Sequence, residues 1–176
     1  MRHFLVLIAI LLAGAASAGQ IDGDRYVGER FGRIEIKAPA GQWLILDREF
    51  SGNNEYGGPV VDLKATAAVA GVFPTVHVSA FKRADASVTA EFVLQTSRTA
   101  VEQKGGEPGP IQTLAVDGKK RWFFTAKVVQ NDKPASLHYL LLEGETAYFA
   151  VQSVVPEAAL GEWQQRVEQL MRQAKY

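Results

Sequence analysis

Apolar runs separated by turn residues predict a four-stranded antiparallel meander in the second half of the chain. Asp117-Gly118 and Gly144-Glu145 each separate two such runs, and these pairs favour two-residue hairpin loops because they tolerate positive φ angles. The polar stretch around Pro134 predicts a longer connection between the middle two strands, since proline cannot donate a backbone hydrogen bond. The predicted strands cover residues 111–116, 119–129, 136–143 and 146–155.

The first half of the chain predicts shorter strands. Residues 33–37 alternate charged and apolar side chains, which indicates a strand with one exposed face. Residues 43–46 are uniformly apolar, so we expect them to be covered on both faces, whereas residues 75–81 alternate again. Two segments rich in glycine and polar residues are expected to lack regular structure, namely a leader at 19–32 and a loop at 51–59.

Two helices are predicted, one before and one after the meander. The first spans about 85–104, with Asp85 or Ser87 as its N-cap and glycine after its last turn. The second spans about 156–175, is amphipathic, and carries Trp163 on its apolar stripe. Because both faces of the longest predicted strand are apolar, the sheet needs cover on both sides, and these helices are the candidates.

Residues 34–43 form a predicted strand followed by a Pro-Gly corner and Trp43, and the Asp117-Gly118 hairpin comes later. With this order of elements the chain resembles the PsbP-like superfamily over about residues 31–175. The resemblance implies an α+β fold, a three-layer α/β/α sandwich around a mainly antiparallel sheet with a C-terminal amphipathic helix, as a single domain over 33–176. It also implies a binding or assembly module, although no position matches closely enough to carry over a family binding residue.

Residues 1–18 have the layout of a secretory signal peptide. Arg2 precedes an apolar run that is short for a bilayer span, and the run ends in a cleavage-like triplet of small residues. Cleavage after Ala18 would start the mature chain at Gly19, and a retained N-terminal anchor is the alternative. No other segment is expected to be transmembrane. Because the sequence resembles bacterial exported proteins, the expected location is the periplasm.

Composition narrows the class of protein. The chain has 176 residues, 47% of them apolar and 22% charged, which is typical of one globular domain. It has no cysteine, so it forms no disulfide and the core alone must hold the fold. Without Arg2 the mature chain has 18 basic and 19 acidic residues, and its longest like-charge block is 119–121. The chain therefore lacks the concentrated basic patch that nucleic-acid-binding proteins carry, and nucleic acid is not an expected partner.

Few residues point to chemistry. The glycine-rich loop could present Asn53, Asn54 and Tyr56 to a ligand or partner, and a plain connector is the alternative. His138 is the other candidate contact residue, and a two-residue loop at 144–145 would place it opposite Val151, in a half-buried position. The sequence has no metal-binding spacing, nucleophile elbow or phosphate-binding loop, so neither a metal nor a cofactor is expected.

The function expected from these patterns is that of an exported, non-catalytic binding or accessory module that contacts a protein partner or an envelope component. The alternative is a carrier of a small apolar ligand held between sheet and helix, or a hydrolase whose site is assembled from scattered residues. A deep pocket lined by His138, Tyr139 and carboxylates would favour the alternative class.

Overall fold

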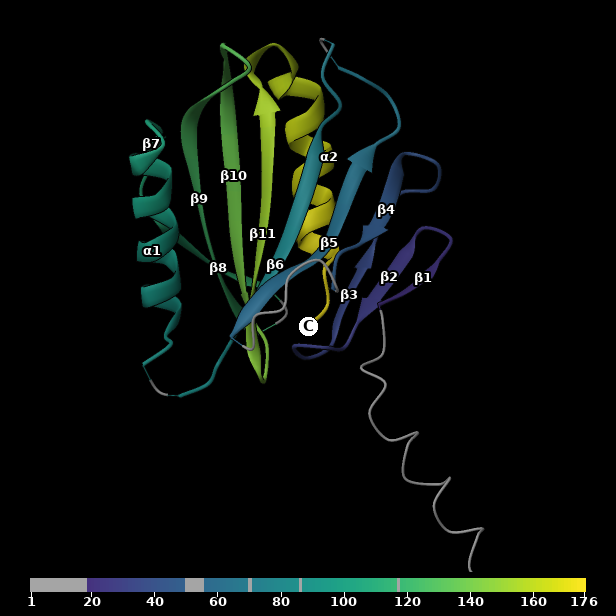
Figure 1. Ribbon diagram of the computed structural model, residues 1–176. Helices are drawn as coiled ribbons and strands as arrows, with labels where there is room; N and C mark the ends of the chain where they lie inside the picture. Colours follow the sequence, from purple (N-terminus) through teal and green to yellow (C-terminus); the bar gives the residue numbers. More distant parts are fainter. Residues whose placement is uncertain (1–18, 50–55, 70, 86, 117) are drawn as a thin grey trace, which may run out of the picture.

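The computed structural model describes an α+β protein in which antiparallel sheet predominates (Figure 1). The larger sheet is built from β4 (Trp43–Asp47), β5 (Gly57–Ala65), β6 (Thr75–Lys82), β7 (Glu107–Pro108), β8 (Gln112–Val116), β9 (Lys119–Gln130), β10 (Lys133–Glu143) and β11 (Ala147–Pro156). The smaller sheet is built from β1 (Gln20–Asp22), β2 (Arg25–Gly28) and β3 (Ile34–Lys37). The structure describes residues 19–49, 56–69, 71–85, 87–116 and 118–176.

Within the described residues, the strand order of the larger sheet is β4-β5-β6-β11-β10-β9-β7, with β8 also paired to β9, and every pairing is antiparallel. The smaller sheet has the order β1-β2-β3. Helix α1 (Ala90–Gln103) follows β6, and helix α2 (Leu160–Gln173) follows β11 after a single 3-10 turn at Glu157–Ala159.

The predicted meander corresponds to strands β8 to β11, which are consecutive both in sequence and in the sheet. Gly118 has a positive φ of 74° in the β8–β9 turn, as the Asp-Gly pattern predicts. The predicted longer connection between β9 and β10 is wrong. Asn131 and Asp132 form a tight turn there with φ values of 51° and 59°, because asparagine and aspartate tolerate the left-handed region that such a hairpin requires.

The connection between β10 and β11 also differs from the prediction. Glu143 lies opposite Tyr148, so the loop is longer than the expected two residues. The register therefore shifts by two residues, and His138 lies opposite Ser153 instead of Val151. A shift of two keeps every side chain on its predicted face, because side chains alternate with a period of two along a strand.

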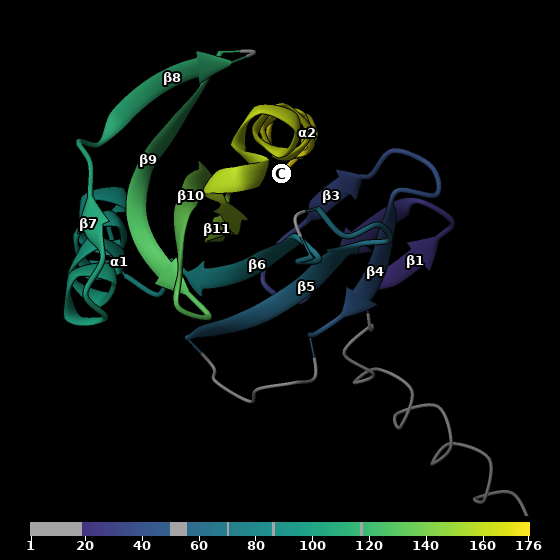
Figure 2. The ribbon, with the colours of Figure 1, turned by 90° about the horizontal axis from the view of Figure 1, so that it is seen from above.

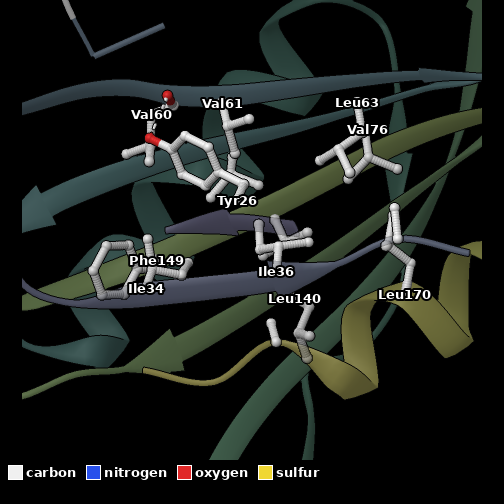
Figure 3. Close-up of a cluster of buried hydrophobic side chains, with 14 of the residues drawn as sticks. Tyr26, Ile34, Ile36, Val60, Val61, Leu63, Val76, Leu140, Phe149 and Leu170 are labelled. Atoms are coloured by element: carbon white, nitrogen blue, oxygen red, sulfur yellow. Dashed lines mark hydrogen bonds between the residues drawn. The ribbon is translucent and has the colours of Figure 1, made fainter. Parts of the chain in front are cut away.

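The leader expected at 19–32 is not a loop throughout, because β1 and β2 form a hairpin that pairs with β3. Tyr26 in β2 is fully buried, and its hydroxyl donates a hydrogen bond to the Val60 carbonyl in β5 at 3.1 Å. Figure 3 shows its ring lying against Val60 and Val61. One buried ring fixes this hairpin, and so short a segment gives no periodic apolar pattern to detect.

The two helices pack on opposite faces of the larger sheet, each over its own apolar cluster (Figure 2). The cluster beneath α1 contains Val93 and Leu94 of the helix with Phe124, Tyr139, Leu141 and Tyr148 of the sheet. The other cluster lies among α2, the smaller sheet and the larger sheet, and includes Ile34, Ile36, Leu63, Leu140, Phe149 and Leu170 (Figure 3).

The start of α1 differs from the prediction. The helix begins at Ala90 with Thr89 as N-cap, and the Thr89 side chain accepts a hydrogen bond from the Phe92 amide. Asp85 and Ser87 instead form a local turn, because the Asp85 carboxylate accepts from the Ser87 amide at 2.7 Å. Trp163 falls within α2, but its side chain lies outside the described side chains.

Two expectations about the strands near loop 51–59 are also wrong. Strand β4 is covered on one face only: Trp43 and Ile45 are buried, whereas Leu44 and Leu46 are 53% and 40% exposed on the face that α2 does not cover. Strand β5 begins at Gly57, inside the segment expected to lack regular structure. Glycine permits this, since a Cβ at position 57 would lie 2.2 Å from the Ala80 carbonyl oxygen.

Candidate functional site

A groove runs between helix α1 and the sheet face beside it, and we call it the α1 groove. Its volume is about 520 Å³, within the range of small-molecule sites. The helix contributes Phe92, Thr96, Ala100 and Lys104 to the wall, among others. The sheet contributes residues of β6, β9, β10 and β11 to the floor and rim, including Phe81, Val129, Tyr139, Gln152 and Val154.

The wall of the groove is one face of α1 that the core leaves open. Phe92, Thr96, Ala100 and Lys104 recur every four residues, so they lie in a row along one side of the helix axis. The helix buries the neighbouring Val93 and Leu94 instead, and this leaves Phe92 58% exposed. Its exposed ring lies beside the apolar lining of the groove, and exposed apolar surface that is contiguous in this way is typical of a contact site.

The floor of the groove contains a hydrogen-bonded hydroxyl pair. Ser97 Oγ of α1 donates to Tyr139 Oη of β10 at 2.8 Å, and the Tyr139 ring stacks on Phe124 with ring centroids 4.8 Å apart. Burial raises the pKa of Tyr139 to about 12. The phenol therefore stays neutral near pH 7, so it serves as a hydrogen-bonding group and not as a base.

The charge of the groove limits its chemistry further. The lining includes no aspartate, glutamate or histidine, and Lys104 is the charged residue among the lining side chains of the described chain. General acid or base catalysis near neutral pH needs a titratable group at the reacting bond, and a metal needs converging ligands. In the part of the chain that the structure describes, no group of three or more His, Cys, Asp or Glu could hold a metal ion. The arrangement is suited to binding.

The sheet face beside the groove continues across the molecule without a helix over it in the described structure (Figure 2). Cross-strand register defines a row of side chains on this face, in which Gln152 lies opposite His77 and His77 opposite Asp62. Leu46 of β4 lies next, opposite Asp62. His77 Nδ1 lies 2.8 Å from Asp62 Oδ1, and Arg48 Nε lies 3.3 Å from Asp62 Oδ2. Apart from Leu46, the side chains of this row are polar or charged, so the mainly apolar α1 groove does not extend along it.

The structure does not bring the sequence-predicted contact residues together. Asn53 and Asn54 lie outside the described residues. Tyr56 is 63% exposed and immediately precedes β5, and it does not line the α1 groove. His138 is buried on the α2 face of β10, the face of Leu140, and therefore lies on the other side of the sheet from the groove. Of the predicted pocket residues, the groove contains Tyr139 alone.

Sequence reasoning missed the residues that make the groove a site, although one signal was present. In the sequence, Phe92, Val93 and Ala100 recur at helical spacing and together make a broad apolar stripe on the first helix. That stripe is wider than the part of the helix that one sheet face buries, and the structure buries Val93 while leaving the other two side chains exposed. An apolar stripe that is too wide for its core is a detectable sign of a second contact surface.

A buried carboxyl group forms a second unusual feature. Glu49, after β4, is 1% exposed, and no described residue forms a hydrogen bond with its Oε2 atom. Burial raises the pKa of Glu49, and the nearby Asp47 charge raises it further, while the Arg30 backbone amide opposes the shift. The Arg30 Nη1 atom is likewise buried without a hydrogen-bond partner. Because its pKa differs between the folded and unfolded states, the protonation of Glu49 makes the free energy of unfolding depend on pH.

Another hollow, of about 650 Å³, lies beside the β10–β11 loop, and its lining includes Arg83 and Lys119. These two cations, which line the hollow together with Arg33 and Lys120, already have partners. Arg83 Nη1 donates to the Gly144 carbonyl at 3.1 Å and lies 3.3 Å from the Glu143 carboxylate, while Lys119 Nζ donates to the Tyr176 carbonyl. These contacts connect loops with the C-terminal residue, so the charged side chains there are explained by their role in holding the fold together. The α1 groove has no comparable set of contacts among the described residues.

Comparison with solved structures identifies the fold. The chain resembles the solution structure of cyanobacterial PsbP from Synechocystis, with a TM-score of 0.64 and 12% sequence identity, over 93% of this chain and 94% of that one. The chain has the PsbP-like fold. No protein-family model matches the sequence, and no curated protein matches it.

Two further structural matches come from other bacteria. A Pseudomonas aeruginosa protein of unknown function, described as a putative regulator, matches with a TM-score of 0.54 and 12% identity over 76% of this chain and 96% of that one. LpqN of Mycobacterium tuberculosis, described as involved in cell envelope biogenesis, matches with a TM-score of 0.54 and 14% identity over 81% and 82%. At such identities the likeness concerns the fold alone. None of the helices in the described chain is both long and apolar enough to cross a membrane.

Proposed function

We propose that this protein is an exported, non-catalytic binding or accessory module that contacts an envelope component or a protein partner through the α1 groove. The observation that supports this most directly is the character of the groove, which is mainly apolar and, among the described residues, lined by no carboxylate or imidazole. Its hydroxyl pair is neutral and fixed by a hydrogen bond. Such a site can hold a ligand but offers no group to accept or deliver a proton near neutral pH.

Export and periplasmic location are part of the same proposal. They rest on the layout of residues 1–18, a charged start, a short apolar run and small residues before Gly19. The likeness to LpqN, a protein described as involved in cell envelope biogenesis, is consistent with a role in the envelope. We also regard α1 and α2 as outer layers of a three-layer α/β/α sandwich with a C-terminal helix, supported by the two apolar clusters.

A small-ligand carrier is the second candidate, and the groove volume of about 520 Å³ favours it over a broad docking face. The hydrolase alternative has less support. A pocket that combined Tyr139 with His138 and carboxylates would favour it, but His138 lies on the opposite face of the sheet from the groove.

Site-specific photocrosslinking in living cells tests the proposal. A photoreactive phenylalanine replaces Phe92 in the groove or, as a matched control, Leu44 on the edge strand, since these side chains are 58% and 53% exposed. Irradiation followed by mass spectrometry of the purified protein should find an adduct at position 92 and none at position 44. No adduct at position 92, or equal adducts at both positions, would remove the groove from the proposal. N-terminal sequencing of the same sample should begin at Gly19.

A further inference from the structure

The α1 groove is polarised along its length. Phe92 lies in the first turn of α1 and Lys104 follows the last turn, so twelve residues separate them, or about 18 Å along the helix axis. On the sheet side, Phe81 is near the end of β6 from which the chain enters α1, and Gln130 ends β9 near the other end of the helix (Figure 1). One end of the groove is therefore aromatic, and the other carries an ammonium and an amide.

The charged end favours an anion. Lys104 is the charged lining residue in the described chain, and no carboxylate among the lining residues competes for it. The nearby Glu107 carboxylate lies 4.0 Å from the Lys127 ammonium, so that acid already has a cation beside it. An anionic group placed at Lys104 gains an ion pair, whereas a cationic group there meets a like charge.

The size of the groove favours a chain over a helix. A helical segment about 10 Å wide and 18 Å long occupies roughly 1,400 Å³, so even half of it needs roughly 700 Å³. The groove holds about 520 Å³, less than half a helix requires. A single hydrocarbon chain is narrower and can lie along the row of Phe92 and Ala100 with its head group at Lys104.

We propose that the α1 groove binds an amphiphile with one apolar chain and an anionic head group, the chain lying toward Phe92 and the head group against Lys104. The inference rests on the proposed function and specifies its ligand class. The hydroxyl pair of Ser97 and Tyr139 lies midway along the groove, between the aromatic and the charged ends. Because Lys104 is the charged lining residue in the described chain, we expect the head group to be recognised at that end of the groove.

Fluorescence titration of the purified exported protein with cis-parinaric acid and with its uncharged methyl ester tests the inference. Both probes have the same chain, so the difference between them isolates the head group. The acid should bind about three- to fivefold more tightly than the ester, the factor expected for a solvent-exposed ion pair, and added salt should reduce that difference. Lys104→Gln should abolish it. Lys37→Gln, an exposed lysine on β3 of the smaller sheet, should leave it unchanged.

A second pair of variants locates the chain. Ala100→Trp fills the groove from an exposed helix position and should abolish binding of both probes, whereas Gln95→Trp, on an exposed part of α1 outside the groove, should not. Retention of binding by Ala100→Trp would overturn the inference. Circular dichroism of both variants checks that the helix is intact.

The outcomes separate the inference from the proposed function. Equal affinity for acid and ester would overturn the assignment of the head group while the groove remained a binding site. No binding of either probe, together with a polypeptide adduct at position 92 in the photocrosslinking experiment, would overturn the amphiphile and leave a protein-binding module. No probe binding and no adduct would overturn both.

Discussion

Replacing Tyr26 tests whether the N-terminal hairpin is part of the domain or an attached leader. The side chain is fully buried between the two sheets, at the point where β2 meets β5. Tyr26→Ala removes the whole ring and leaves a cavity, which costs about 3–5 kcal/mol for a buried aromatic residue. That is a large part of the stability of about 5–15 kcal/mol of a typical domain. The melting temperature should fall by about 6–20 °C.

Tyr26→Phe separates the ring from the hydroxyl. The hydroxyl donates to the Val60 carbonyl, but that oxygen also accepts the Arg48 amide at 2.9 Å. Losing the phenol leaves the Val60 oxygen with its other partner but takes the Tyr26 hydroxyl away from the buried Glu49 carboxyl, and the expected cost is about 0.5–1.5 kcal/mol. The ring accounts for most of the effect, so the two variants should differ by at least about 1.5 kcal/mol.

Urea unfolding followed by circular dichroism measures both changes, with Tyr56→Ala as a control. Tyr56 is 63% exposed, so its removal should change stability by less than about 0.5 kcal/mol. Hydrogen exchange should also show that the amides of β1 and β2 lose protection in Tyr26→Ala. If that variant unfolded within about 1 kcal/mol of the wild type, the hairpin would not be an integral part of the core, and the boundary predicted at residue 33 would stand.

Four further outcomes are expected. Tyr139→Phe should cost about 1 kcal/mol in urea unfolding, and combining it with Ser97→Ala should cost less than the sum of the single changes, because the two hydroxyls share one hydrogen bond. Since burial raises the pKa of Glu49, the folded state favours its protonated form. The contribution of Glu49 to stability is complete below its unfolded-state pKa and is lost as pH rises through its folded-state pKa. Glu49→Gln should therefore flatten the stability-pH curve, measured by urea unfolding, over that pH range. An unchanged curve would contradict the role of Glu49. Phe92→Ser should change the free energy of unfolding by less than about 0.5 kcal/mol, because the ring is 58% exposed, while weakening binding in the parinaric acid titration. Trp163→Ala is predicted from the sequence alone to cost about 3–5 kcal/mol, and an unchanged melting temperature would refute a core role.

Local chemistry explains which parts of the fold could be predicted from the sequence. The turn glycine at 118 and the apolar runs beside it depend on neighbouring residues only, and they correctly predicted the strands of the meander. The turn at Asn131-Asp132 was missed because neither residue is glycine, although both have positive φ angles. The predicted register of β10 and β11 was wrong by two residues. Shifting the pairing by two keeps the same side chains on the apolar face, so the sequence pattern alone does not distinguish the two registers.

Features that depend on tertiary neighbours could not be predicted in this way. Leu44 and Leu46 have the same apolar character as buried strand residues, and they are exposed because no other element covers that face of β4 in the described structure. Tyr26 is buried because β5, far along the chain, lies over it. The α1 groove likewise exists because the sheet is wider than helix α1, and the sequence indicates it only through the wide apolar stripe of that helix (Figure 2).

The exposed ring of Phe92 should matter for ligand binding but not for the stability of the fold. Folding requires Val93 and Leu94 of the same helix turn, which the cluster beneath α1 buries, but it does not require the ring beside them. The exposed ring of Phe92 faces an apolar groove of about 520 Å³. In the free protein, a polar residue at this position would give nearly the same free energy of folding. The ring can, however, lose its remaining exposed area when a ligand enters, and that burial stabilises the complex at about 25 cal/mol per Å². A variant at this position that unfolds like the wild type but no longer binds would therefore assign the residue to recognition.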